Sequence, residues 1–234
     1  YTFYNLKISG AGAKTTNGVV TVNNNLDVSA GTLDPAGNNL TVNGTTVING
    51  TFDDSNGAGG TNTFTGDVTV NGTWNNTGDE DPFFGGNLTN NGTFNGGTVA
   101  ATYTFTGAGK TIGGTQPISV GDATISGTYT NNLVSPDYFE ILDDLTGGGT
   151  LTQGANAELR IGDEAGALAT FTANTVPNTV IYNAGGGQGV NATVYHHLTI
   201  NKSGGTATLS GATTVNGDLQ ILAVSILTII RILK

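Results

Sequence analysis

Cysteine and methionine are absent from this chain of 234 residues, and charged side chains are scarce. The lack of cysteine excludes a disulfide framework and a thiolate metal site. Only 7 residues are Lys or Arg against 17 Asp or Glu, so the formal net charge is -10. With so few cations, phosphate neutralisation cannot drive binding, and neither nucleic acid nor an anionic membrane surface is an expected partner. Because the sequence opens with Tyr1, we expect a processed or excised start, with any signal peptide outside it.

A helical stripe of apolar residues is also missing from every window, which excludes folds that alternate strands with helices. Glycine, asparagine and threonine occupy the places where charges normally stand, and 38 residues are glycine. Between these turn formers, short runs alternate β-branched and small polar residues, which is the pattern of a strand with one buried face. The clearest predicted strands are 19–22, 40–42, 68–70, 123–125, 180–182 and 198–200.

A short phrase recurs along the chain: an alternating β run followed by Asn-Gly-Thr or Asn-Asn. Its copies include Val20-Thr21-Val22-Asn23-Asn24, Leu40-Thr41-Val42-Asn43-Gly44-Thr45, Val68-Thr69-Val70-Asn71-Gly72-Thr73-Trp74 and Leu88-Thr89-Asn90-Asn91-Gly92-Thr93-Phe94. Several copies are about 20 residues apart, as Thr21 is from Thr41 and Gly72 from Gly92, and such a period indicates a solenoid. We therefore predict an all-β, right-handed parallel β-helix with coils of about 20 residues. The alternative is a β-sandwich or tandem β-sandwiches.

The sequence also repeats on a longer period of roughly 190 residues. Tyr4-Asn5-Leu6-Lys7-Ile8 has its counterpart in Tyr195-His196-His197-Leu198-Thr199-Ile200. We predict one β-solenoid domain over residues 1–218 and an apolar terminal strand over 219–234. The domain divides into regular repeats over 1–130, irregular coils over 131–194 and a restart of the repeat over 195–218.

Stacked side chains are a further expectation of this fold. Coils of a β-helix lie about 4.8 Å apart, so residues one period apart stand above one another. Phe52, Trp74 and Phe94 should then form an aromatic ladder, either inside the core or as a stacking platform for carbohydrate. By the same spacing we predict an asparagine ladder of Asn43, Asn71 and Asn91 at one corner.

Catalytic signals are poor, and we expect the protein not to be an enzyme. His196 and His197 are adjacent in a strand-like run, so alternation should point them to opposite faces and away from a common site. The alternative is a carboxylate pair that acts as acid and base, as in polysaccharide-active β-helix enzymes. The candidate pairs are Asp53-Asp54, Asp143-Asp144 and Asp163-Glu164.

Calcium is the only metal cofactor that the sequence brings into consideration. Asp79, Glu80 and Asp81 place three hard oxygen donors on one predicted loop. No EF-hand or nonapeptide calcium pattern accompanies them, so solvated turn residues are the competing interpretation.

The last residues depart from the repeat, because Gly, Asn and Asp vanish and an apolar run begins. The run is shorter than the ~20 residues that span a bilayer and Arg231 interrupts it, so we expect no membrane insertion. Three interpretations stay open: a frame-shifted segment, a buried terminal strand of the same chain, or a strand that pairs with a neighbouring subunit.

Both ends of the predicted solenoid are apolar, and neither carries an amphipathic capping helix. Uncapped ends expose unpaired backbone groups that can add strands, and identical subunits joined head to tail give a filament that does not close. The residues expected to mediate this self-association are Tyr1, Phe3, Tyr4, Leu6, Ile8, Leu219, Ile221, Val224, Ile226, Ile229, Ile230 and Ile232.

Phrases such as Asn25-Leu26-Asp27-Val28-Ser29-Ala30-Gly31-Thr32-Leu33 and Leu40-Thr41-Val42-Asn43-Gly44 resemble the repeat regions of large secreted bacterial surface proteins and adhesins. The likeness is to parallel β-helix passenger regions of the autotransporter and filamentous-haemagglutinin type, over residues 1–130 and 195–222. It implies a secreted, extracellular or cell-surface structural protein that forms a fibre or filament. The alternatives are a segment of a long adhesin stalk, binding glycans or cell surfaces, and a polysaccharide-active enzyme.

Overall fold

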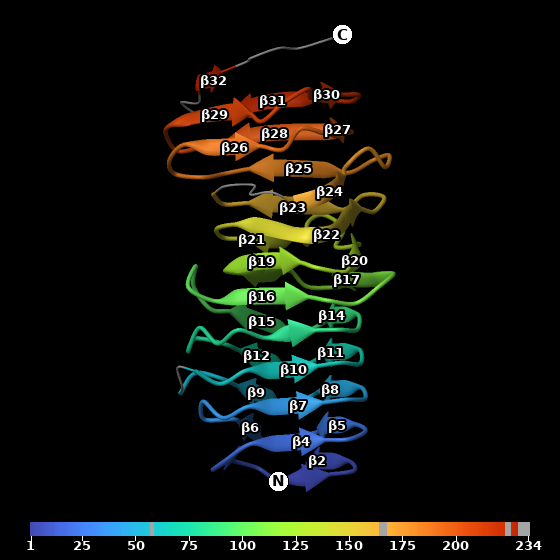
Figure 1. Cartoon of the computed structure of the whole chain (residues 1–234), viewed down its shortest axis with the longest axis vertical. Coiled ribbons are helices and arrows are strands. Elements are labelled where there is room, and N and C mark those ends of the chain that lie inside the picture. The colour runs from blue at the N-terminus through green and yellow to red at the C-terminus, as the bar shows by residue number, and fades with distance from the viewer. Residues whose placement is uncertain (57–58, 164–167, 223–225, 229–234) are drawn as a thin grey trace.

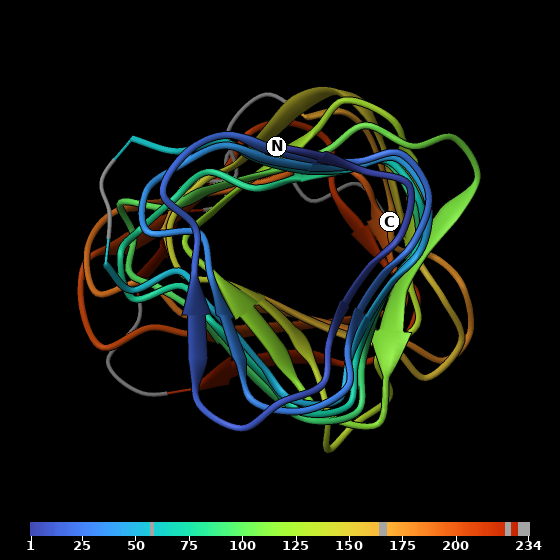
Figure 2. The same ribbon diagram turned by 90° about the horizontal axis from the view of Figure 1, so that it is seen from below.

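The computed structural model describes residues 1–56, 59–163, 168–222 and 226–228. In these residues every regular element is a strand, so they contain no helix that could span a membrane. The strands stack into one tall column that starts at the bottom of Figure 1. The near strands point to the right as the chain climbs, and from below the chain circles clockwise as it recedes (Figure 2). The prediction of a right-handed parallel β-helix is therefore confirmed.

Each regular coil contributes three strands to a three-sided cross-section (Figure 2), and we name the sides face A, face B and face C in chain order. Face A is built from β1 (Thr2–Phe3), β4 (Val20–Val22), β7 (Leu40–Val42), β10 (Asn62–Phe64), β13 (Phe83–Phe84), β16 (Thr102–Phe105) and β19 (Asp122–Ile125). Face B is built from β2 (Leu6–Ile8), β5 (Leu26–Val28), β8 (Thr46–Ile48), β11 (Val68–Val70), β14 (Leu88–Asn90), β17 (Lys110–Gly114), β20 (Thr128–Asn131) and β24 (Leu168–Thr172).

Face C forms an 11-stranded sheet of its own among the described residues. It contains β3 (Ala13–Thr15), β6 (Thr32–Asp34), β9 (Thr51–Asp53), β12 (Thr73–Asn75), β15 (Thr93–Gly96), β18 (Ile118–Val120), β21 (Phe139–Ile141), β23 (Glu158–Ile161), β25 (Thr179–Tyr182), β28 (His197–Asn201) and β31 (Leu219–Leu222). Neighbouring strands on this face are parallel throughout, so one sheet edge lies at each end of the column.

The upper coils are less regular than the lower ones. The long strand β22 (Leu145–Gln153) pairs with β19 at its start and with β20 at its end, and so joins faces A and B. Above it the face A positions are taken by a separate sheet of β26 (Gln188–Val190), β29 (Thr206–Leu209) and β32 (Ile226–Thr228). The face B positions there belong to β27 (Val194–Tyr195) and β30 (Thr214–Val215).

Coil length is close to the predicted period but is not constant. Leu6 pairs with Leu26, and Leu26 with Thr46, each a step of 20 residues. The step rises to 24 residues between Leu88 and Ile112. The extra residues lie at the corners, where they change a loop without shifting the alternation of the strands.

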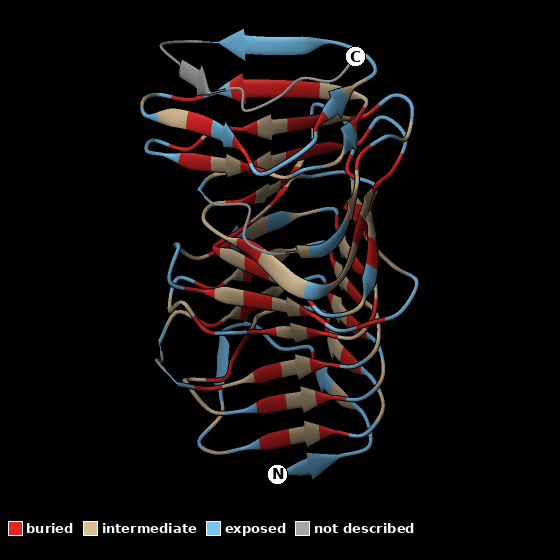
Figure 3. Ribbon diagram, turned by 45° about the horizontal axis from the view of Figure 1, so that its top comes forward, coloured by how far each residue is buried: buried red, intermediate tan, exposed pale blue. Residues whose placement is uncertain are grey.

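The core fills the interior of the column from bottom to top. Side chains alternate in and out along each strand, so Val20 and Val22 are buried while Thr21 between them is half-buried. Figure 3 shows the same alternation of buried and partly buried residues up the near face. Because each coil buries its apolar positions against the coils above and below, stability comes from stacking neighbours and not from single coils.

The predicted aromatic ladder is confirmed as part of the core. Trp74 is in register with Phe52 below and Phe94 above. Its ring stacks on that of Phe52 with centroids 4.6 Å apart, and on that of Phe94 with centroids 5.5 Å apart and planes at 6°. Phe52 and Trp74 are fully buried, so they cannot offer a platform to carbohydrate.

The predicted asparagine ladder is wrong in one member. Asn71 donates to Asn49 at 2.9 Å, and Asn91 donates to Asn71 at 3.1 Å, whereas Asn43 lies outside this ladder. The reason is that the Asn-Gly-Thr phrase closes two different corners. Asn43 follows β7 at the corner between faces A and B, while the three ladder residues follow face B strands at the corner between faces B and C.

The long repeat does not return to the face on which it began. Leu6–Ile8 forms β2 on face B, whereas the matching Leu198-Thr199-Ile200 lies in β28 on face C. Thr21 and Thr214, which also correspond, lie in β4 on face A and in β30 at a face B position. The second copy of the phrase is therefore advanced by one side of the coil.

Candidate functional site

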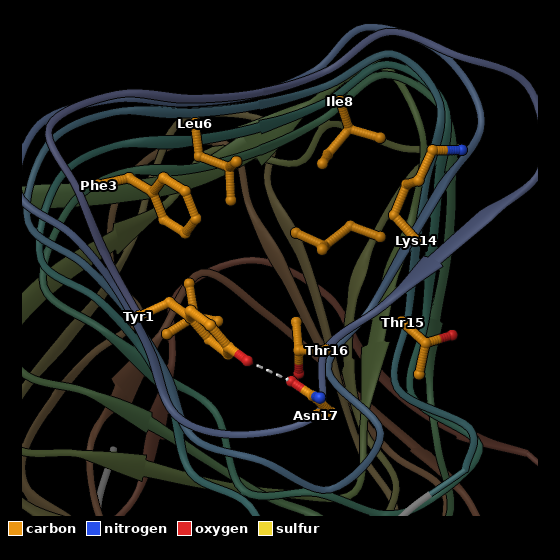
Figure 4. Close-up of a pocket in the computed structure, with 10 residues that line it drawn as sticks. Tyr1, Phe3, Leu6, Ile8, Lys14, Thr15, Thr16 and Asn17 are labelled. Carbon is orange, nitrogen blue, oxygen red and sulfur yellow. Dashed lines mark hydrogen bonds between the residues drawn. The ribbon is translucent and has the colours of Figure 1, made fainter.

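The first coil leaves the core open at the lower end of the column. A hollow of about 270 Å³ opens there, lined by Tyr1, Phe3, Leu6, Ile8, Lys14, Thr15, Thr16, Asn17, Val20 and Leu33. Figure 4 shows the side chains of Phe3, Leu6 and Ile8 inside the ring of ribbons, and Tyr1 held by its hydroxyl on Asn17 at 2.8 Å. Phe3 is 38% exposed, although Val22, its register partner one coil higher, is fully buried. Core positions that higher coils cover are thus open to solvent here.

Backbone edges accompany this open core on all three faces. The sheets end at β1 and β2, which belong to faces A and B, and at β3 on face C. Among the described residues these strands pair only with the coil above, so their lower sides present N–H and C=O groups that this part of the chain leaves unpaired. Such an edge is a template for a further parallel strand.

One cation stands at the mouth of the hollow. Lys14 is in register with Leu33, and Leu33 with Phe52, so Lys14 occupies a core position. Its stem lines the hollow while the ammonium donates to the carbonyl of Ala11 at 2.9 Å, at the corner. A lysine that faces inward on an edge strand is a device that disfavours uncontrolled pairing of sheet edges.

The upper end also exposes apolar residues that lie in register with the core. Leu219 and Ile221 in β31 are 42% and 45% exposed, whereas their partners Leu198 and Ile200 in β28 are buried. β32, which contains Ile226, pairs with β29 of the same chain. The remaining residues predicted for self-association at this end, Val224, Ile229, Ile230 and Ile232, lie outside the described residues.

The structure therefore brings Tyr1, Phe3, Leu6 and Ile8 together around one hollow. β31, which contains Leu219 and Ile221, lies at the opposite end of the column (Figure 1). Tyr4 belongs to the first coil and is 71% exposed, but it does not line the hollow. Lys14 was missed, although aligning Ala13-Lys14-Thr15 with Thr32-Leu33-Asp34 one coil later would have placed it inward.

The three acidic residues considered for calcium point to different partners. The Asp79 carboxylate accepts the backbone N–H of Thr98 at 2.6 Å, and that of Asp81 accepts the N–H of Thr102 at 2.8 Å. Glu80, between them, turns inward and is buried. Within the described residues no three acidic or histidine side chains converge to hold a metal ion.

Glu80 instead lies near Asp54 inside the corner between faces C and A. β9 ends at Asp53, which is half-buried and whose carboxylate accepts a hydrogen bond from Asn75 at 2.8 Å, while Asp54 is only 2% exposed. Burial, together with the charge of Glu80, raises the pKa of Asp54 to about 7, although a hydrogen bond from Asn62 opposes the shift. Burial also raises the pKa of Glu80. Sequence reasoning missed this interior pair because it treated Asp53 and Asp54 as one surface unit.

A second column of carboxylates lies higher on the same corner. The backbone N–H of Asp163 donates to the carbonyl of Asp143 at 3.3 Å, which stacks the two residues on neighbouring coils. Burial, followed by the charges of Asp122 and Asp144, raises the pKa of Asp143. Glu164, the other member of this predicted pair, lies outside the described residues.

The expectation that the two histidines face apart is wrong. β27 ends at Tyr195 and β28 begins at His197, so His196 lies at the corner between two strands and alternation does not apply to it. The two imidazole rings lie edge to face with centroids 4.0 Å apart. Nδ1 of His197 accepts the backbone N–H of Asp218 at 2.9 Å, which ties this corner to the next coil.

Comparison with protein-family models, with curated proteins and with solved structures finds no match.

Proposed function

We propose that the protein is a non-catalytic, extracellular structural protein that builds a surface fibre or filament by end-to-end association of its coils. The observation that carries this proposal is the open first coil, where a continuous apolar core and three unpaired strand edges meet at one surface. Covering such a surface with another coil would pair its backbone groups and bury apolar area at ~25 cal/mol per Å². A secreted or cell-surface location is part of the proposal and is supported by the resemblance of the repeats to bacterial surface proteins.

The two ends are complementary in strand direction. All strands run in the same direction around the column, so the upper edge of one copy has the direction that the lower edge of another requires. Pairing of the upper edge of one copy with the lower edge of the next therefore gives head-to-tail order.

The proposal is tested by placing a charge on core positions at the two ends. In F3D and I221K the charge enters a position that lies in register with a buried residue, Val22 or Ile200. The matched controls T2D and Q220K place the same charge one residue away, where the alternation of the strand turns the side chain away from the core. We expect filaments of the wild-type chain and both controls by negative-stain electron microscopy, and isolated short rods of F3D and I221K.

Short rods of the wild-type chain at all concentrations would overturn the filament proposal. That result would favour the second candidate, a segment of a long adhesin stalk in which a preceding coil covers the hollow. The feature that favours this candidate is the register itself, because the open positions of β1, β2 and β3 continue the columns of the coils above. Glycan arrays with the monomeric rod would then separate a binding segment from a passive spacer.

A further inference from the structure

Three buried side chains inside the corner between faces C and A each carry an oxygen without a hydrogen-bond donor. Among the described residues, Oδ1 of Asp54, Oδ1 of Asn62 and Oε1 of Glu80 all lack a partner. The residues are 2%, 0% and 2% exposed. A buried polar atom without a partner is destabilising, and more so where it carries charge, so a cation bound among these oxygens would stabilise them.

Asp54 and Asn62 mark the two ends of one corner loop and touch each other. Asp54 follows β9 directly and Asn62 begins β10. The Asn62 amide N–H donates to Oδ2 of Asp54, which leaves the amide oxygen and Oδ1 of the carboxylate for another ligand. The two donor oxygens therefore belong to side chains in direct contact.

Glu80 comes to the same place from the next corner loop. The carboxylate accepts the backbone N–H of Gly59 at 3.3 Å, which joins it to the loop between Asp54 and Asn62. Asn76 fixes the backbone of Glu80 on both sides, because its Oδ1 accepts the Glu80 N–H at 3.0 Å and its amide donates to the Glu80 carbonyl at 2.9 Å. The second loop is thus held in place over the first.

Two backbone hydrogen bonds also join the first corner loop to the second. The N–H of Asp54 donates to the carbonyl of Asn75 at 2.7 Å, and the N–H of Gly78 donates to the carbonyl of Asp54 at 3.1 Å. Asp54 is therefore enclosed between its own coil and the next. No lysine or arginine of the described residues forms an ion pair with Asp54 or Glu80.

We propose that Asp54, Asn62 and Glu80 bind a calcium ion inside the solenoid corner. Two carboxylates and one amide oxygen are hard donors, and when ionised they supply the two negative charges that a divalent cation neutralises. Calcium accepts irregular oxygen geometry, whereas magnesium demands a near-ideal octahedron and keeps its water. The ion links two successive coils, so its effect is on the stability of the column.

Titration of metal-stripped protein tests this site independently of assembly. At pH 8, wild-type chain treated with EDTA should gain thermal stability when calcium chloride is added, and equilibrium dialysis with radiolabelled calcium should find one ion per chain. The substitutions D54N and E80Q keep the shape but remove one charged ligand each, and should weaken binding about tenfold or more. The control D53N removes the neighbouring carboxylate, which is half-buried and bound to Asn75, and should bind as the wild type does.

Three results would overturn the proposal. The first is a wild-type chain that binds no calcium by dialysis. The second is D54N and E80Q variants that bind calcium as tightly as the wild type does. The third is an equal gain in stability with sodium, magnesium and calcium salts at matched ionic strength, which marks a general salt effect. Circular dichroism of each variant confirms that the β fold is retained before binding is compared.

Discussion

The backbone of Gly72 lies so close to that of Gly50 that a Cβ on Gly72 would overlap the carbonyl oxygen of Gly50. The same relationship continues upward, because a Cβ on Gly92 would overlap the carbonyl oxygen of Gly72. Both residues lie at the corner between faces B and C, directly before face C strands. The glycine of the repeated Asn-Gly-Thr phrase is therefore explained by close approach of successive corners.

Replacing Gly72 by alanine should destabilise the fold by about 1–3 kcal/mol, because backbone atoms on one side of the new methyl group must move. Gly148 offers a matched control within a strand, since a Cβ there meets nothing within 4 Å. The measurement is urea unfolding of wild type, G72A and G148A. Equal unfolding midpoints for G72A and G148A would contradict the prediction, because they would show that the corner accommodates a methyl group with no loss of stability.

The asparagine ladder lies at the same corner, and breaking it should reduce the free energy of unfolding by less than the G72A substitution does. Asn71 donates to Asn49 and accepts from Asn91, so N71A removes two hydrogen bonds on an exposed surface. We expect a loss of about 1 kcal/mol, because each such bond contributes modestly in competition with water. The control N43A changes the same phrase at the other corner, where the Asn43 side chain makes no hydrogen bond among the described residues. Equal losses for N71A and N43A would contradict the assignment of the ladder.

Asp67 gives a prediction for the dependence of stability on pH. Its carboxylate accepts the backbone N–H of Asn87 at 2.8 Å, and this bond is the main reason that its pKa is lowered. A lowered pKa in the folded state means that Asp67 stabilises the fold above its unfolded pKa of about 3.9, and that this contribution is lost at lower pH. The difference in melting temperature between wild type and D67N should therefore favour wild type at pH 7 and shrink between pH 4 and 2. A difference that does not change over this range would contradict the prediction.

Periodicity in the sequence was enough to predict the fold and the interior of the lower coils. Trp74 could be placed between Phe52 and Phe94 because face C repeats the pattern Thr, aromatic residue, Asp or Asn at nearly constant spacing. It was not enough for Asn43, since one phrase serves two corners and only the count of strands in a coil distinguishes them. The failure at His196 has the same origin, because the position of a corner was needed to decide whether strand alternation applied.

The interior carboxylates could not be predicted, because their direction depends on loop geometry. Asp53 and Asp54 are chemically identical and adjacent, yet one ends a strand and the other enters the core. Loops at the corner between faces C and A also vary in length, so no fixed spacing connects Asp54 with Glu80. Only the stacking of two loops of different length brings these residues together.

The arrangement of strands has a mechanical consequence. The strands circle the column, so the backbone hydrogen bonds between coils run along its length (Figure 1). A tensile load applied between the bottom and the top would open these bonds one coil at a time from an end, instead of shearing a whole sheet at once. Each released coil of 20 residues, such as that from Leu6 to Leu26, would add roughly 70 Å of extended chain. Under force the molecule would lengthen in regular increments and hold the remaining coils folded between them.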